Sequence, residues 1–196
     1  VHDGFMTSAF PKREIRNTLG EWVSARGLRQ FRVAETEKYP HVTFFLNGGR
    51  EAPFAGEERA MPPSPAVATY DLRPEMSAAA VTDHLLEAIA AGHDLIVVNY
   101  ANPDMVGHTG NLEAAISACA AVDACLGRVL PALAAAGGVM LLTADHGNCE
   151  VMRDPRTGAP HTAHTLSAVP VALIGGAGGL RLRDGRLADV APTMLA

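Results

Sequence analysis

The strongest constraint on the fold of this chain is the alternation of short apolar runs with segments of helical period. Five runs rich in β-branched and apolar residues are predicted to be mostly buried strands: residues 30–34, 42–46, 94–100, 139–143 and 169–175. Segments with apolar residues three and four positions apart lie between several of them. Alternating strands and helices are typical of a mostly parallel sheet covered by helices on both faces, so the sequence predicts the α/β class.

Two predicted helices have clear apolar faces and recognisable ends. The first is expected to begin near Ser77 as N-cap and to stop at Gly92. The second carries apolar residues at helical spacing from Leu112 to Val129, and Pro131 is expected to end or kink it. Both helices are long enough to cover one face of a sheet.

The remaining pattern fits one domain with one core. A chain of 196 residues is long enough for a single α/β domain. A weaker helical pattern covers residues 15–26, before the first strand. Residues 47–65 are rich in Pro and Gly and have no period, so they are predicted to form a long loop.

Composition excludes several classes of protein. Hydrophobic residues make up 48% of the chain and charged residues 19%, values typical of a soluble globular protein and not of a disordered or fibrous one. The net charge is −5 without a basic stripe, so nucleic acid is not an expected partner. No membrane partner is expected, because no apolar run approaches the roughly 18 residues of a membrane span, and no secretory signal is visible.

The cysteine pattern favours a reducing compartment. The chain has three cysteines, Cys119, Cys125 and Cys149, without paired spacing, which argues against a disulfide framework and against a Cys-rich zinc site. A cytoplasmic location is therefore expected. Cys119 falls on the apolar face of the second helix and is predicted to be a small core residue.

Three short segments place residues of metal-ligand type next to predicted strands. Residues 102–108 follow the strand at 94–100, residues 144–148 follow the strand at 139–143, and residues 161–164 precede the strand at 169–175. The carboxyl ends of strands in a parallel sheet form the edge where ligands bind, so the first two segments should converge there. The third could close over the same place.

Carboxylates and imidazoles in these segments suit zinc, manganese or iron. The candidates are Asp104, His108, Asp145, His146 and His164, and five such groups are more than one ion usually takes from protein. Two ions about 3.5–4 Å apart would clamp both oxygens of a phosphoryl displacement. Each pair taken alone is more often a capped loop or a surface pair, and it is their joint position at strand ends that favours a metal site.

Other histidines carry less information. His161 could be a ligand, a hydrogen-bond partner of a ligand or a substrate contact. His84 is expected on a solvated helix surface, and His41 and His93 have no evident ligand neighbourhood.

Several strings together resemble the cofactor-independent phosphoglycerate mutases of the alkaline phosphatase superfamily. The resemblance runs from about Gly4 to the end of the chain and rests on five motifs in the family's order: residues 34–39, 41–45, 99–110, 143–148 and 161–165. The resemblance implies an alkaline phosphatase-like sheet sandwiched by helices. It also implies interconversion of 3-phosphoglycerate and 2-phosphoglycerate through a phosphoserine intermediate, with two divalent metal ions and without 2,3-bisphosphoglycerate.

The resemblance also implies roles for individual residues. Asp104, His108 and His164 would hold one ion, usually manganese in bacterial members, although zinc or another metal stays open. Asp145 and His146 would belong to the second ion. Lys38 would contact the substrate phosphate, whereas the residues alone suggest a salt bridge for it.

The chain departs from the family pattern at both ends. The family's nucleophilic serine, one further metal carboxylate and the substrate-holding domain come from segments that these 196 residues do not contain. Residues 1–196 are therefore expected to be the C-terminal part of the metal-binding phosphatase-type domain, incomplete at both ends and inactive alone. An exposed sheet edge would then invite self-association.

Two alternatives stay open. The first is another enzyme of the superfamily, such as a phosphopentomutase or a metal-dependent phosphatase. The second is a non-catalytic metal-binding module.

Overall fold

Three parallel strands form the main sheet of the computed structural model, which describes residues 9–10 and 15–196. Strand β1 (Gln30–Ala34) lies between β2 (Glu57–Ala60) and β3 (Leu95–Asn99). Gln30 is in register with Glu57 on one side and with Leu95 on the other. The parallel pairing confirms the predicted α/β class.

A second sheet has two antiparallel strands. Strand β4 (Met140–Thr143) pairs with β5 (Val171–Ile174) and places Met140 opposite Ile174. Within the described part of the chain, neither strand pairs with the three-stranded sheet. Both sheets therefore have free edges, and self-association through such an edge stays a prediction.

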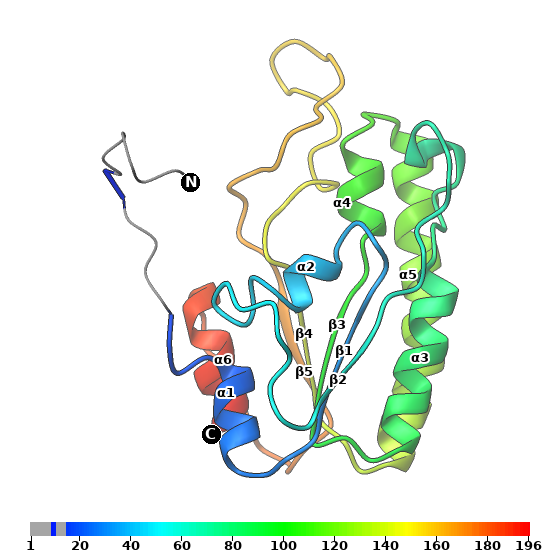
Figure 1. Ribbon diagram of the computed structural model, residues 1–196. Helices are drawn as coiled ribbons and strands as arrows, with labels where there is room; N and C mark the ends of the chain where they lie inside the picture. The colour runs from blue at the N-terminus through cyan, green and yellow to red at the C-terminus, as the bar shows by residue number, and fades with distance from the viewer. Residues whose placement is uncertain (1–8, 11–14) are drawn as a thin grey trace, which may run out of the picture.

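Helices cover the three-stranded sheet on two sides (Figure 1). Helices α3 (Ala78–Ala90) and α5 (Leu112–Ala135) pack together on one side, and α3 contacts β1 and β3. On the other side lie α1 (Leu19–Ala25) and α2 (Tyr39–Val42). The short elements that remain are α4 (Asn102–Gly107), α6 (Val190–Leu195), η1 (Tyr70–Leu72) and η2 (Leu187–Asp189).

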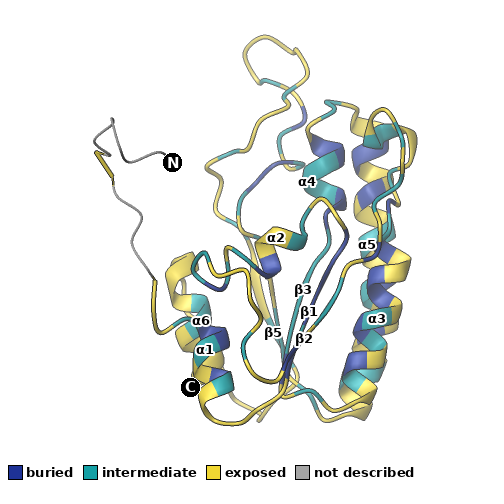
Figure 2. Cartoon of the chain, in the orientation of Figure 1, coloured by how far each residue is buried: buried dark blue, intermediate teal, exposed yellow. Residues whose placement is uncertain are grey.

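The core lies between the main sheet and its helices (Figure 2). Val33 of β1 packs with Val81 and Leu85 of α3 and with Val129 of α5. A second cluster joins α4 to the N-terminal half of α5 around Val106. This second cluster fixes α4, the helix that carries Asp104, against the body of the molecule.

The structure corrects two predicted elements. Residues 42–46 are not a strand, because the chain turns through α2, where Pro40 in the first turn presets a helical φ angle. Residues 47–65 are not all loop, because they contain β2. Strand β2 was missed because its residues are mostly charged, and Glu57 is buried by pairing with Arg59 and Asn47 instead of by apolar contacts.

Helix α5 differs from its prediction in two ways. Pro131 lies inside the helix, which continues to Ala135. A proline in a helix interior costs about 3 kcal/mol, so packing of α5 against α3 and α4 outweighs that cost. Cys119 is exposed and not a core residue, since Ala115 and Ala118 occupy the buried face beside it.

By length and composition alone, α5 could also cross a membrane. Its most apolar 18 residues have a mean hydropathy of 1.5, and 17% of them are buried. The expectation that no segment would approach a membrane span is therefore wrong for α5. One such helix is weak evidence for a membrane, because core helices of globular proteins meet the same criterion. Arg128 of this helix forms an ion pair with Asp83 of α3 at 2.6 Å.

The Val81 contact predicts a measurable effect on stability. Val81 is 0% exposed, and Val81→Ala should lower the free energy of unfolding by about 1–3 kcal/mol, because it leaves a cavity between β1 and α3. Val139→Ala is the matched control, since Val139 is 54% exposed and its truncation should cost about 0.5 kcal/mol or less. Urea unfolding followed by circular dichroism measures both, and equal losses would contradict the described core.

Candidate metal centre

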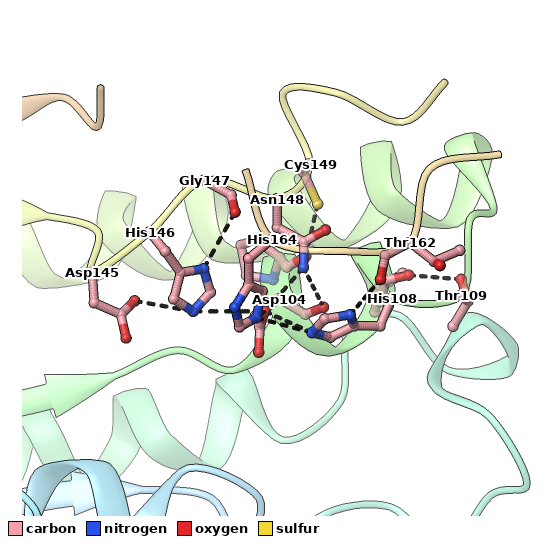
Figure 3. A network of polar contacts seen from close by, with 12 residues as sticks. Asp104, His108, Thr109, Asp145, His146, Gly147, Asn148, Cys149, Thr162 and His164 are labelled. Atoms are coloured by element: carbon pink, nitrogen blue, oxygen red, sulfur yellow. Dashed lines mark hydrogen bonds and ion pairs between the residues drawn. The ribbon is translucent and has the colours of Figure 1, made fainter. Parts of the chain in front are cut away.

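The carboxylate of Asp104 lies at the centre of the candidate site (Figure 3). Its Oδ1 atom is 3.0 Å from His164 Nε2 and 3.1 Å from His108 Nε2. Asn148 Nδ2 donates a hydrogen bond of 2.9 Å to the same oxygen. The other oxygen, Oδ2, forms an ion pair with Lys38 Nζ. Four side chains from three separate loops and one short helix therefore converge on one carboxylate.

Local structure places Asp104 and His108 side by side. Helix α4 begins directly after β3, with Pro103 in its first turn, and His108 is its C-cap. Residues four apart share one face of a helix, which brings Asp104 and His108 together. The Nδ1 atom of His108 lies 2.6 Å from the carbonyl oxygen of Thr162, so Nδ1–H donates there and Nε2 is left as the ligand atom.

The loop after β4 and the loop before β5 are joined to each other. Thr165 N donates to the carbonyl oxygen of Gly147 at 2.9 Å. The carboxylate of Glu150 accepts from Thr165 Oγ1 and, at 2.6 Å, from Asn148 N. These bonds hold His164 on one loop beside His146 on the other.

His146 and Asp145 extend the site away from His108. The rings of His146 and His164 are stacked, with centroids 3.7 Å apart and an interplanar angle of 21°. His146 Nε2 lies 3.8 Å from Asp104 Oδ1 and 3.7 Å from Asp145 Oδ1. The Asp145 side chain is 61% exposed, so it lies at the rim of the site (Figure 3).

The donor set and its spacing fit a transition metal ion. Ligand atoms of Asp104, His146 and His164 lie within 4.8 Å of one another, and His108 Nε2 is 3.1 Å from His164 Nε2. Tetrahedral bonds of about 2.0–2.1 Å place neighbouring ligand atoms about 3.3–3.4 Å apart, close to these separations. One carboxylate with imidazoles suits manganese, zinc, iron or cobalt.

The charges around Asp104 keep it ionised. Burial alone would raise the pKa of Asp104, but hydrogen bonds from Lys38 and Asn148, with the charges of Lys38 and His108, lower it to about 2. The pKa of His41 is lowered first by burial and then by the charge of Lys38, while Asp145 and Asp104 act in the opposite direction. His41 thus lies within the electrostatic field of the same site.

The structure brings together most of the residues singled out in the sequence. Asp104, His108, His146 and His164 converge, and the loop at 161–164 does close over the strand ends. Among the described residues, Asp145 forms an ion pair with His146 and not with Asp104, His108 or His164. The assignment of these residues to particular ions stays a prediction, as does the phosphate contact of Lys38.

His161 lies apart from the cluster in the contacts of the described residues. Its backbone N–H donates to the carbonyl oxygen of Met152 at 3.0 Å, and its Nδ1 atom is enclosed without a hydrogen-bond partner. Sequence reasoning gave no role to Asn148, which donates to the Asp104 carboxylate. Asn148 lies in the family string at 143–148 and in the segment at 144–148 that follows a predicted strand, and these were the signals available for it.

The α/β fold and the cluster of carboxylate and imidazole groups agree with a superfamily match: the chain belongs to the Metalloenzyme superfamily, whose family model matches residues 4–196. It is 70% identical over 194 residues to the 2,3-bisphosphoglycerate-independent phosphoglycerate mutase of Cereibacter sphaeroides strain ATCC 17025. It is also 70% identical over 196 residues to the protein of the same name in Ruegeria pomeroyi. These matches confirm the resemblance drawn from the motifs.

A solved structure shares the fold. A Leishmania mexicana phosphoglycerate mutase, crystallised at low cobalt concentration, is 37% identical and superposes with a TM-score of 0.76, covering 85% of this chain and 32% of that one. The chain spans 38% of the Cereibacter sphaeroides relative and 39% of the Ruegeria pomeroyi relative.

Close packing at Gly107 predicts that a single methyl group will disturb the site. A Cβ atom at Gly107 would overlap the side chain of Asn148 and lie 3.1 Å from Cys149 Sγ. Gly107→Ala should therefore displace the amide bonded to Asp104 and lower the free energy of unfolding by about 1–3 kcal/mol.

Gly127→Ala is the matched control for this substitution. Gly127 lies within α5, and a Cβ there meets nothing within 4 Å, so the change should stabilise the protein by about 0.5–1 kcal/mol. Thermal unfolding of both variants compares them directly. A Gly107→Ala protein as stable as the parent would show that the described packing is wrong.

The lowered pKa of Asp104 predicts acid sensitivity. Its folded-state pKa of about 2 lies below its ordinary value of 3.8, so its contribution is present above pH 4 and is lost as the pH falls through about 2. The contribution is at most about 2 kcal/mol. In metal-free buffer, the stability difference between the parent and Asp104→Asn should shrink by about this amount from pH 5 to pH 2. A constant difference would contradict the lowered pKa of Asp104.

Proposed function

We propose that this chain forms the metal-binding part of the catalytic centre of a cofactor-independent phosphoglycerate mutase. The proposed reaction interconverts 3-phosphoglycerate and 2-phosphoglycerate and does not use 2,3-bisphosphoglycerate. The observation that carries the proposal is the convergence of His108, His164 and Asn148 on Asp104. The names of relatives at 70% identity support the mutase over a phosphopentomutase or a simple phosphatase.

The proposed centre holds two divalent ions, with manganese as the leading candidate. Asp104, His108 and His164 hold the first, which their mutual separations of 3.0–3.1 Å support. Asp145 and His146 belong to the second, and the 3.7 Å separation of their ligand atoms supports this. Bound ions polarise phosphoryl oxygens and neutralise a phosphate dianion.

Lys38 is proposed to bind the substrate phosphate. Its side chain is only 12% exposed, and its Nζ atom lies against Asp104 at the centre of the site. A metal ion on Asp104 would take over neutralisation of that carboxylate, which frees the ammonium group for a phosphate oxygen. Lys38 is well suited to this exchange because its ammonium is a mobile point charge.

Three further residues orient the ligands. Asn148 holds Asp104 through its side-chain amide, with bonds to both the carboxylate and the backbone carbonyl oxygen. The Thr162 carbonyl orients the ring of His108, and Glu150 holds the loop that carries Asn148. Such supporting contacts typically change metal affinity or activity 10–100-fold when they are removed.

The nucleophile is proposed to come from outside these 196 residues. Among the described residues, no serine contacts Asp104, and the relatives are more than twice as long as this chain. The isolated chain is therefore expected to bind an ion without interconverting phosphoglycerates. We further propose a cytoplasmic location, in line with the three free cysteines.

A test combines metal content with turnover in the intact protein that contains this chain. In the presence of Mn²⁺, ³¹P NMR of 3-phosphoglycerate should show 2-phosphoglycerate forming without added 2,3-bisphosphoglycerate. His164→Ala should remove one bound ion and reduce turnover at least 100-fold, because it deletes a ligand of the first ion.

The matched control is His84→Ala. His84 lies on α3, where it forms an ion pair with the exposed Glu87, and among the described residues it has no contact with the site, so metal content and turnover should not change. Unchanged metal content in His164→Ala would overturn the ligand assignment. Release of inorganic phosphate without 2-phosphoglycerate would favour the phosphatase alternative, and metal binding without turnover in the intact protein would favour a non-catalytic module.

A further inference from the structure

Two thiols from distant parts of the chain meet beside the metal centre. Cys119 lies on α5, and Cys149 follows Asn148 in the loop after β4. The thiols are close enough that each one shifts the pKa of the other. Both line one shallow pocket of about 200 Å³, together with Leu112, Ala115 and Ile116. Neither thiol has a part in the proposed phosphoryl chemistry.

The position of Cys149 is closely defined. Its Sγ–H group donates to the carbonyl oxygen of Pro103 at 2.7 Å, at the start of α4. Gly107 on the same helix leaves the room that the sulfur atom occupies, since a Cβ there would lie 3.1 Å from it. Cys149 is half-buried, so a reagent in solvent reaches it less easily than Cys119.

Cys119 is the more exposed partner. Its side chain is exposed and lines the pocket together with apolar residues of α5. The neighbouring Cys149 thiol lowers the pKa of the Cys119 thiol, although burial acts in the opposite direction. The Cys119 thiol, and after it burial, raises the pKa of Cys149. A thiolate and a protonated neighbouring thiol are the arrangement found in redox-sensitive cysteine pairs.

We propose that Cys119 and Cys149 form an intramolecular disulfide when the protein meets a peroxide. The Cys119 sulfur attacks one oxygen of the peroxide, so that an S–O bond forms, the O–O bond breaks and the second oxygen leaves as water after taking up a proton. The Cys149 thiol then loses its proton, its sulfur bonds to that of Cys119, and the hydroxyl group leaves as a second water. The two sulfurs lose two electrons in total, and the peroxide gains them.

The crosslink would join α5 to the loop that carries the metal-centre residues. Asn148, which donates to Asp104, is the residue before Cys149. The disulfide would also take the sulfur of Cys149 away from the carbonyl oxygen of Pro103, next to Asp104 in α4. This inference rests on the thiol geometry and does not depend on the proposed mutase activity.

The test is peptide mapping of the intact protein that contains this chain. Reduced protein is treated with a small excess of hydrogen peroxide, alkylated with N-ethylmaleimide, digested and analysed by mass spectrometry. We expect a crosslinked peptide pair joining Cys119 to Cys149, about 2 Da lighter than the two reduced peptides together, and its loss on treatment with dithiothreitol.

Three variants make the result specific. Cys149→Ser should stop the reaction at a sulfenic acid on Cys119, which dimedone traps, and Cys119→Ser should leave Cys149 reduced. Cys125→Ser is the matched control, because Cys125 is buried on the same helix and the crosslink should form as in the parent. The proposal is overturned if Cys119 in the folded parent stays fully alkylated after peroxide, or if it gives only sulfenic acid or intermolecular disulfides.

Discussion

The buried carboxylate of Asp104 is the interaction on which the site depends. A carboxylate that is 13% exposed is costly unless it is paired and hydrogen-bonded. Its partners come from residues 38, 108, 148 and 164, so satisfying this one charge requires four segments of the chain to meet. The same packing places Nε2 of His108 3.1 Å from Nε2 of His164. An ion bound there could replace Lys38 as the positive charge that compensates the Asp104 carboxylate.

A second buried charge explains part of the sheet. Arg32 in the central strand is 0% exposed, and burial lowers its pKa to about 10, although Glu57 of the neighbouring strand acts to raise it. Gln30 accepts a hydrogen bond of 2.5 Å from Arg32, and Asn47 donates to Glu57 at 3.0 Å. The buried Glu57 of edge strand β2 is thus compensated by Asn47 and by the charge of Arg32 in β1, which is why the sequence of β2 lacks an apolar pattern.

The parts of the fold with strong local signals were predictable. Strands β1, β3, β4 and β5 and helices α3 and α5 follow apolar periodicity, and the family strings pointed to Asp104, His108, His146 and His164. The features that were predicted wrongly have a common cause, because each of them depends on contacts with residues distant in the chain. Strand β2 needed Arg32 and Asn47, the pairing of β4 with β5 reversed the expected direction, and the exposure of Cys119 depends on how α5 is turned against α4.

By itself, the sequence determined the α/β class, the family and the residue types of the metal centre, because periodicity and motif spacing are local properties of the chain. Only the tertiary structure decided which of these residues meet. It placed Lys38 against Asp104, joined the loop of Asn148 to that of Thr165, brought His41 into the field of the site and set Cys119 beside Cys149. The physical reason is that these contacts link residues 18 to 66 positions apart in the chain or depend on a charge that other elements bury. A local sequence pattern contains no information about such distant partners.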